Sequence, residues 1–167
     1  MKKYCLDTSA FSNPIQGMPE DIYITLWNQV CNLVKSGAFA TTTEIYNELT
    51  HIPGNLGQCL KDHEAEIKLE VGSGNWDYTA YLANFAALHS KYEPYINGTG
   101  GSKMSLSIPD LSIVVLGKTL SLPVISMEIP CANNPNTKRR KIPDVCATES
   151  VAHMTFNDLL RAEGITI

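Results

Sequence analysis

The sequence predicts an α/β fold in which helices cover both faces of a central, mainly parallel sheet. Segments with strand character alternate with segments whose apolar residues recur at helical spacing. This alternation is typical of parallel sheets with right-handed crossovers. The 167 residues suit one domain with one core, and we find neither an internal repeat nor a domain boundary. We therefore expect a single domain over residues 1–167.

The strands are predicted from short apolar runs that end at turn residues or polar side chains. The first run ends on Asp7, which Thr8 and Ser9 follow at once. A buried carboxylate without a partner costs several kcal/mol or more, so this side chain must be solvated, hydrogen-bonded or bound to a cation. The predicted strands are residues 4–7, 38–41, 123–127 and 153–156.

The helices are predicted from apolar periodicity and from end signals. In the first long helix, residues 21–36, apolar side chains recur at helical spacing until Gly37 stops the helix. In the helix at 76–92 we expect an inward stripe of Tyr78, Leu82, Phe85 and Leu88 or His89. The remaining predicted helices are 42–49 (capped by Thr42 or Thr43), 56–71, 110–120, 143–150 and 157–163; residues 97–102 and 129–140 are predicted loops.

Composition excludes several classes of protein. The formal net charge of −4 argues against a protein that coats nucleic acid, although it permits local handling of a phosphodiester. The five cysteines are widely spaced without a CxxC pair, so a disulfide framework or a structural zinc site is not expected. No apolar run approaches the ~20 residues of a membrane span, and the N-terminus lacks a secretory signal. We expect a cytoplasmic protein with no membrane partner.

Acidic residues are predicted at one edge of the sheet. Asp7 and Glu128 end two strands, Glu44 and Glu48 follow a third strand on one helix, and Asp110 opens an apolar helix. Ligands of open parallel sheets bind beyond the carboxyl ends of the strands, where these acids could converge. Clustered carboxylates take up protons or bind a cation, and oxygen ligands favour Mg²⁺ or Mn²⁺. Such sites commonly hydrolyse or transfer phosphates, whereas no nucleotide-binding P-loop or GxGxxG motif is present.

Several motifs, in this order, carry a resemblance to a known family. YCLDTSAFSNP, TTTEIYNEL, IPDLSIVVLGKTL, PVISMEIP and KIPDVCATESVAHMTFNDLL resemble segments of the PIN-domain nucleases, in particular the toxin nucleases of bacterial toxin–antitoxin pairs. The resemblance implies a three-layer α/β/α sandwich and a Mg²⁺- or Mn²⁺-dependent endoribonuclease. It also implies an RNA substrate, an antitoxin partner and a homodimer.

The resemblance also implies which residues form the site. Asp7, Glu48 and Asp110 match three acids of the family, and Glu128 matches the fourth, where the family usually has Asp in a T-x-D pattern. Asp144 is a rival or an additional metal ligand. The hydroxyls of Thr8 and Ser9 would orient Asp7 or a metal-bound water.

Each assignment has a structural alternative. Asp7 could be a turn residue that bonds the amides of Ser9 or Ala10, and Asp110 could simply interact with the helix dipole. Glu44 is assigned to the helix start and Glu48 to the metal. The basic run Lys138, Arg139, Arg140 and Lys141 could be a solvated loop, or could contact RNA phosphates or an acidic antitoxin surface.

Two alternative functions stay open at this point. A PIN-like fold whose fourth acid is altered could be a non-catalytic module that binds RNA or a protein. A similar carboxylate cluster could also serve a metal-dependent phosphatase or a DNA nuclease, because nothing in the sequence reads the 2′-hydroxyl of RNA.

Overall fold

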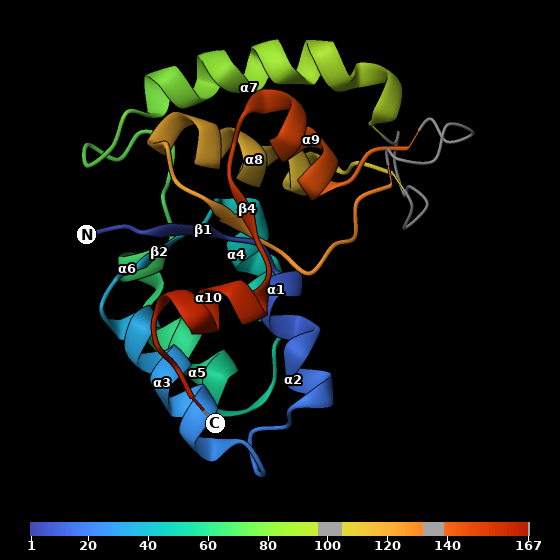
Figure 1. The fold of residues 1–167 in the computed structure, drawn as a ribbon. Helices are drawn as coiled ribbons and strands as arrows, with labels where there is room; N and C mark the ends of the chain where they lie inside the picture. The colour runs from blue at the N-terminus through green and yellow to red at the C-terminus, as the bar shows by residue number, and fades with distance from the viewer. Residues whose placement is uncertain (97–104, 132–138, 167) are drawn as a thin grey trace.

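The computed structural model describes residues 1–96, 105–131 and 139–166, and it confirms the predicted fold class. The chain forms an α/β/α sandwich: α7, α8 and α9 lie on one side of the sheet, and α3, α5 and α10 lie on the other (Figure 1). The helices are α1 (Ser9–Ser12), α2 (Pro14–Gly17), α3 (Ile24–Lys35), α4 (Thr43–Leu49), α5 (Gly54–Asp62), α6 (Glu64–Ile67), α7 (Tyr78–Tyr92), the 3₁₀ turn η1 (Glu93–Tyr95), α8 (Ile108–Leu120), α9 (Ile142–Glu149) and α10 (Phe156–Ala162).

The sheet within the described residues has four strands, all parallel, in the order β2-β1-β3-β4. The strands are β1 (Tyr4–Leu6), β2 (Phe39–Ala40), β3 (Val124–Ile125) and β4 (His153–Met154). Cys5 is paired with Ala40 on one side and with Val124 on the other. The chain moves from β1 to β2 on one side and later to β3 on the other, so the strand order reverses between β1 and β3. Ligands of open α/β sheets bind at such a reversal.

Helix α8 is the buried helix of the upper layer. Its residues from Leu111 to Gly117 are all buried, and α7 packs on its outer side. Gly117 allows α8 to approach β3 closely, because a Cβ at this position would lie 2.6 Å from Cγ2 of Val124. The N-terminus of α8 is held by a capping box between Ser107 and Asp110. Tight packing thus fixes the helix whose first turn carries a predicted site residue.

An aromatic cluster forms the core of the lower layer. Phe11 contacts Phe39 edge-to-face at 5.5 Å between ring centroids, and Trp27 stacks on Phe156 at 5.4 Å. These four rings come from α1, β2, α3 and α10, and each is at most 2% exposed. Trp27 is thus a packing residue of this core. Because Phe11 belongs to this cluster, the cluster fixes the position of α1 and of the turn that contains Asp7 and Ser9.

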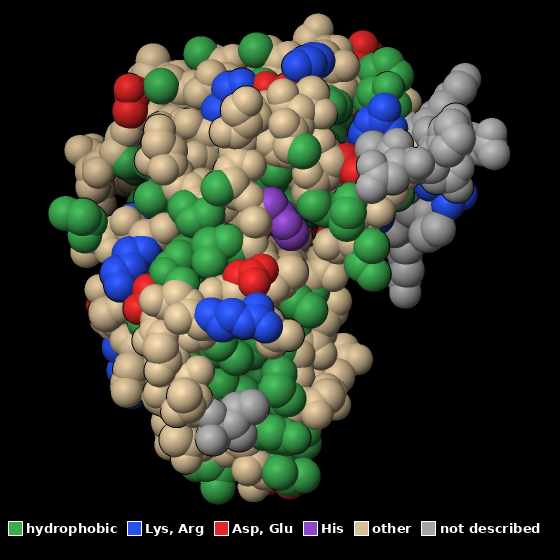
Figure 2. Space-filling model, in the orientation of Figure 1, with side chains coloured by type: hydrophobic (Ala, Val, Ile, Leu, Met, Phe, Trp, Pro, Cys, Tyr) green, Lys and Arg blue, Asp and Glu red, His purple; other side chains and the backbone are tan. Residues whose placement is uncertain are grey.

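Two predicted helices have different bounds. The helix predicted at 21–36 begins only at Ile24. Ile22, which precedes it, is 70% exposed, so no contact with the core holds this residue in the helix. Ile24 itself is 58% exposed. Figure 2 shows hydrophobic side chains gathered on the lower half of the drawn face, around α10 and below it. The helix predicted at 56–71 is divided into α5 and α6, and Lys68 then forms a parallel bridge with Thr41.

The inward face of α7 was predicted correctly only in part: Leu88 is buried and Phe85 packs against the core, as expected, but Leu82 does not. Tyr81, Leu88 and Tyr92 are its buried residues, whereas Leu82 is 47% exposed. Alanines and aromatic residues occur all round this helix, so its apolar periodicity is weak and does not select one face. The short helices α1 and α2 were not predicted, because four residues are too few to show a period.

The predicted loop at 97–102 lies outside the described residues, as does most of the loop at 129–140. Within the residues that are described, no helix is long and apolar enough to cross a bilayer.

Candidate functional site

The candidate site lies beyond the carboxyl ends of β1 and β3, at the reversal of strand order. Asp7 comes directly after β1, and Glu128 comes three residues after the end of β3. The first turn of α8 adds Asp110. The charges of these three carboxylates interact, which places them in one electrostatic neighbourhood although they are far apart in sequence. The structure thus brings together three of the four acids predicted as catalytic.

Asp7 is held by the turn that follows its strand. It is 4% exposed, and its Oδ2 accepts hydrogen bonds from the Ser9 amide at 3.0 Å and from the Ser9 hydroxyl. The same hydroxyl accepts a hydrogen bond from the Met127 amide at 2.9 Å. Ser9 therefore joins the end of β1 to the segment after β3. The hydrogen bond from the Ser9 amide, which was the structural alternative for Asp7, is present. This bond alone does not distinguish a turn residue from a metal ligand, so the charges around Asp7 have to be considered.

The surroundings of Asp7 raise its pKa from 3.8 to about 7. Burial is the main cause, because removal from water disfavours the charged carboxylate. The hydrogen bonds from Ser9 act in the opposite direction, while the negative charges of Asp110 and Glu128 raise the pKa further. A carboxylate in this state gains from taking up a proton or a cation.

Asp110 has both a structural partner and acidic neighbours. Its Oδ2 accepts a hydrogen bond from the Ser107 amide at 2.8 Å, as a capping residue does. Burial raises its pKa, the charge of Glu128 adds to this effect, and the bonds from Ser107 and the charge of Lys141 oppose it. The predicted dipole role and the predicted site position therefore coexist at this residue.

Glu48 occupies the rim of the site. It is exposed, and its Oε2 accepts a hydrogen bond from the Thr8 hydroxyl at 2.8 Å. Glu44 lies one turn earlier in the first turn of α4, as its assignment to the helix start predicted. Thr8 thus links the turn after Asp7 to Glu48, the residue that was assigned to the metal.

Glu128 and Asp144 both stabilise the start of α9. Glu128 accepts bonds from Nζ of Lys141 at 2.8 Å and from the Ile142 amide at 2.9 Å. Asp144 is 6% exposed and accepts bonds from the amides of Lys141 at 2.9 Å and Cys131 at 3.1 Å. Glu128 is the member of this pair whose charge acts on Asp7 and Asp110.

The basic run is only partly described. Lys138 lies outside the described residues. The guanidinium of Arg140 lies 4.7 Å from the ring centroid of Tyr95, and its Nη1 donates to the carbonyl of Arg139. Lys141 forms an ion pair with Glu128. One lysine of the run therefore contacts the acids directly.

The donor set of the site suits a hard divalent cation, because the converging groups are carboxylates and hydroxyls. Among the described residues, no three Asp, Glu, His or Cys side chains are grouped closely enough to hold a metal ion as they stand. Glu128 is paired with Lys141, and Asp110 with Ser107. Joint ligation would require these side chains to rotate away from their present partners.

Buried hydroxyls around the site were missed at the sequence level. Oγ1 of Thr41 donates to the carbonyl of Leu6 at 3.0 Å, and the hydroxyls of Thr42 and Ser112 lie 2.9 Å apart. The hydroxyl of Ser126 lies 2.8 Å from Nε2 of His153. Thr41, Thr42 and Ser126 come directly after β2 or β3, and this position was the available signal.

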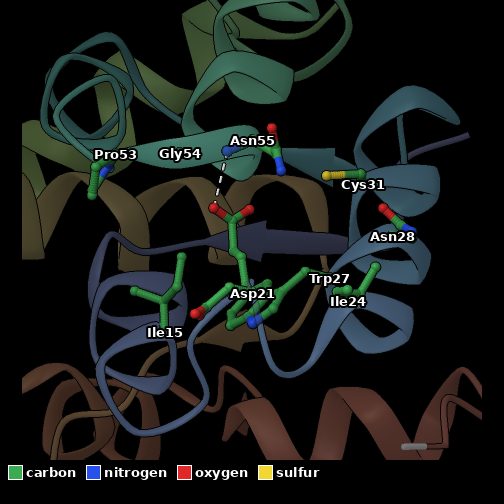
Figure 3. Close-up of a pocket in the computed structure, with 10 residues that line it drawn as sticks. Ile15, Asp21, Ile24, Trp27, Asn28, Cys31, Pro53, Gly54 and Asn55 are labelled. Atoms are coloured by element: carbon green, nitrogen blue, oxygen red, sulfur yellow. Dashed lines mark hydrogen bonds between the residues drawn. The ribbon is translucent and has the colours of Figure 1, made fainter.

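A pocket of about 550 Å³ lies elsewhere, at the start of α3 and α5 (Figure 3). None of the predicted acids lines it. Glu20 lines the pocket and accepts hydrogen bonds from the amides of Asn55 at 2.9 Å and Leu56 at 2.6 Å. Gly54 has a φ of +79°, and a Cβ there would lie 2.0 Å from Oε2 of Glu20. Glu20 therefore caps α5.

Comparison with known proteins gives a family. The family model described as "Domain of unknown function (DUF4411)" matches residues 4–167, which include every described element and every predicted site residue. A search of curated proteins gave no match. Since the match covers nearly the whole chain, the protein belongs to the DUF4411 family.

Proposed function

We propose that this protein is a divalent-metal-dependent endoribonuclease that hydrolyses RNA phosphodiester bonds. The observation that carries the proposal is the burial of Asp7 at the end of β1, with Asp110 and Glu128 as acidic neighbours, an arrangement that also raises the pKa of Asp7 to about 7. Perturbed carboxylates at a reversal of strand order are typical of functional sites. The choice of RNA comes from the sequence resemblance to PIN-domain nucleases.

The residues of the site have distinct tasks in this proposal. Asp7, Asp110, Glu48 and Glu128 would hold one or two Mg²⁺ or Mn²⁺ ions, and Asp144 would support Glu128 by fixing the start of α9. Such an ion polarises the phosphoryl oxygen, activates water and stabilises the leaving oxygen. Ser9 orients Asp7 through two hydrogen bonds, and Thr8 orients Glu48 through one. Lys141, released from Glu128, would offer its ammonium to a phosphate.

The biological setting follows from the same resemblance. We propose that the protein is the toxin of a toxin–antitoxin pair, acts in the cytoplasm and forms a homodimer. An inhibiting partner with an acidic side chain would bind Lys141 in place of Glu128. Glu128 would then lose the lysine that compensates its charge.

Two of the capping aspartates in the described residues provide a matched test. Asp110 and Asp158 both close a capping box, with Ser107 and Thr155. Asp110→Asn and Asp158→Asn therefore remove the charge from the same kind of cap and keep an oxygen that can accept the cap hydrogen bond. Asp158→Asn also weakens an exposed ion pair with Arg161, and only Asp110 lies with the other acids. We expect Asp110→Asn to lose calorimetric binding of Mn²⁺ and to reduce cleavage of a mixed RNA pool by about 100-fold or more. Asp158→Asn should bind and cleave like the wild type.

The outcomes separate the proposed function from its alternatives. Metal binding without cleavage of RNA or single-stranded DNA would favour a non-catalytic module that binds RNA or protein. Cleavage of DNA in preference to RNA would favour a DNA nuclease. Equal losses in both variants would show that Asp110 acts only as a helix cap. The absence of metal binding in the wild type would refute the nuclease proposal.

A further inference from the structure

A second pocket lies where the chain leaves β2 and enters α4. Its volume is about 460 Å³, within the range of small-ligand sites. The walls include Trp76, Tyr81 and Phe85, and the exposed side chains of Val71 and Leu82 lie at its rim. The ring centroids of Tyr81 lie 5.3 Å from Trp76 and 6.1 Å from Phe85. The rings are tilted to one another by 59° and 40°, and Tyr81 is 6% exposed. A flat ligand can therefore stack on the partly buried ring of Trp76 or of Phe85.

The polar side chains that line the pocket come from two segments of the chain. Thr42, Thr43 and Glu44 enter from the start of α4, and the charge of Glu44 acts on the phenol of Tyr81. Glu70 also lines the pocket, but its carboxylate is paired with Lys68 at 2.6 Å. No lysine or arginine is among the described residues that line it. The pocket therefore suits a neutral ligand with N–H donors and does not suit a phosphate.

Two elements connect this pocket to the acids. Glu44 lines the pocket, and Glu48, one turn further along α4 or about 6 Å, is bonded to Thr8 beside Asp7. Thr42 lines the pocket and lies 2.9 Å from the hydroxyl of Ser112 in α8, the helix whose first turn carries Asp110. Ser112 and Asp110 point to different sides of that helix, so the closer connection is the one through α4. A ligand in the pocket would therefore lie next to a phosphodiester held at the acids.

We propose that the pocket of Trp76, Tyr81 and Phe85 binds an unpaired guanine base of the RNA, adjacent to the bond that is cut; this rests on the proposed ribonuclease function. Single-stranded RNA is recognised by stacking of its splayed bases on aromatic rings and by hydrogen bonds to the base edges. Guanine presents two adjacent groups of N–H donors on its Watson–Crick edge, which match the two oxygens of one carboxylate. Glu44 supplies that carboxylate at the mouth of the pocket.

The two tryptophans provide a direct readout of binding. Trp76 lines this pocket and its Nε1 donates to the carbonyl of Glu70, whereas Trp27 lines the distant pocket at α3 and donates to Met18. We would titrate ¹⁵N-labelled protein with GMP and with UMP in EDTA and follow both indole N–H signals by NMR. We expect the Trp76 signal to shift and the Trp27 signal to stay, with GMP binding about five-fold more tightly than UMP.

Matched variants test the assigned contacts. Phe85→Ala should weaken GMP binding by about five-fold or more, through lost stacking. Glu44→Gln should remove the preference for GMP over UMP. His89→Ala is the control, because His89 stacks on Phe85 at 6.1 Å but does not line the pocket; GMP binding should be unchanged.

Cleavage of an RNA pool, with sequencing of the product ends, distinguishes this inference from the proposed function. GMP binding at Trp76 together with cleavage beside guanine would support both. GMP binding at Trp76 without any RNA cleavage would support the base pocket and refute the ribonuclease. Cleavage with no shift of Trp76, or a shift of Trp27 instead, would overturn the base pocket and leave the ribonuclease standing. Binding of an arginine-containing peptide at Trp76 in place of GMP would also overturn the inference.

Discussion

Two buried carboxylates of this protein have opposite properties. Asp7 is 4% exposed and the side chain of Glu149 is 5% exposed, yet the pKa of Asp7 is raised to about 7 and that of Glu149 is lowered to about 2. Burial raises both pKa values, but Glu149 receives hydrogen bonds from Lys118, Lys91 and Tyr92 that outweigh it. Asp7 has hydroxyl and amide donors and further carboxylates as neighbours.

The difference separates a carboxylate whose charge is paired with cations from one whose charge is not. Lys91 and Lys118 each lie 2.6 Å from Glu149, so the negative charge is fully compensated and joins α7, α8 and α9. The charge of Asp7 is not compensated by a cation that contacts it in the described structure. Uncompensated burial destabilises the fold, and it is tolerated where a ligand or a proton supplies the missing charge.

The largest expected effect concerns the stability contributed by Asp7. Its pKa is higher in the folded protein than 3.8, so the folded state holds the proton more tightly and the free energy of unfolding falls as pH rises from about 4 to about 7. The shift corresponds to a few kcal/mol, about 4 at most. We expect Asp7→Asn to lack this fall and to be more stable than wild type at pH 8 in EDTA. Urea unfolding at pH 5 and pH 8 measures the difference.

A loss of stability in Asp7→Asn at pH 8 would show that the carboxylate of Asp7 stabilises the fold, as that of Glu149 does. It would mean that the bonds from Ser9 require the carboxylate and that Asp7 is a structural turn residue. Added Mg²⁺ should stabilise the wild type at pH 8 and leave Asp7→Asn unchanged, because a ligand stabilises only the state that binds it.

Glu149 should show the opposite sign. Its pKa is about 2 in the folded protein against 4.5, so its contribution is present above pH 4.5 and is lost as pH falls toward 2. We expect Glu149→Gln to lower the free energy of unfolding by about 2 kcal/mol at pH 7, because two ion pairs are lost. The cost is no larger because the partly exposed ammonium groups of Lys91 and Lys118 regain water. Urea unfolding at pH 7 and pH 3 should show a smaller difference from wild type at pH 3.

The control for Glu149→Gln is an exposed pair. Arg161 is 74% exposed in its ion pair with Asp158, so Arg161→Ala should change the free energy of unfolding by less than about 0.5 kcal/mol. Equal effects of the two substitutions would show that the lysines around Glu149 do not compensate its burial.

The smallest effect is expected at Ser9. Its hydrogen bonds lower the pKa of Asp7, and its hydroxyl also receives the Met127 amide. Ser9→Ala should raise the pKa of Asp7 above 7 and cost about 1 kcal/mol of stability. Carbon-detected NMR titration of the Asp7 carboxyl group measures the pKa. Ser12→Ala, on the same short helix, is the matched control and should leave the titration of Asp7 unchanged.

Much of the fold was predictable because its signals are local. The four strands lie inside the predicted ranges, and α4, α8 and α9 have nearly the predicted bounds. Proline, glycine and capping hydroxyls mark these ends in the sequence. The face of α7 was predictable only in part, because its buried side is chosen by contact with α8 and its own apolar residues lie all round it.

The candidate site was only partly predictable. The positions of Asp7 and Glu128 at the ends of two predicted parallel strands placed them at one edge of the sheet in advance, but the partner of each carboxylate was not visible. Glu128 and Asp144 had equal standing in the sequence, and the structure distinguishes them: Glu128 acts on Asp7, whereas Asp144 holds the amides of Lys141 and Cys131. The role of Glu149 was not predicted from the sequence, because the lysines that compensate its charge lie on other helices.

The sequence by itself determined the alternation of strands and helices, the ends of most elements and the set of acids available to the site. These properties depend on neighbours within a few residues along the chain. Only the tertiary structure decided that Asp7 is an uncompensated carboxylate and Glu149 a compensated one. The physical reason is that a pKa depends on burial and on nearby charges, and both are supplied by residues that only folding brings together.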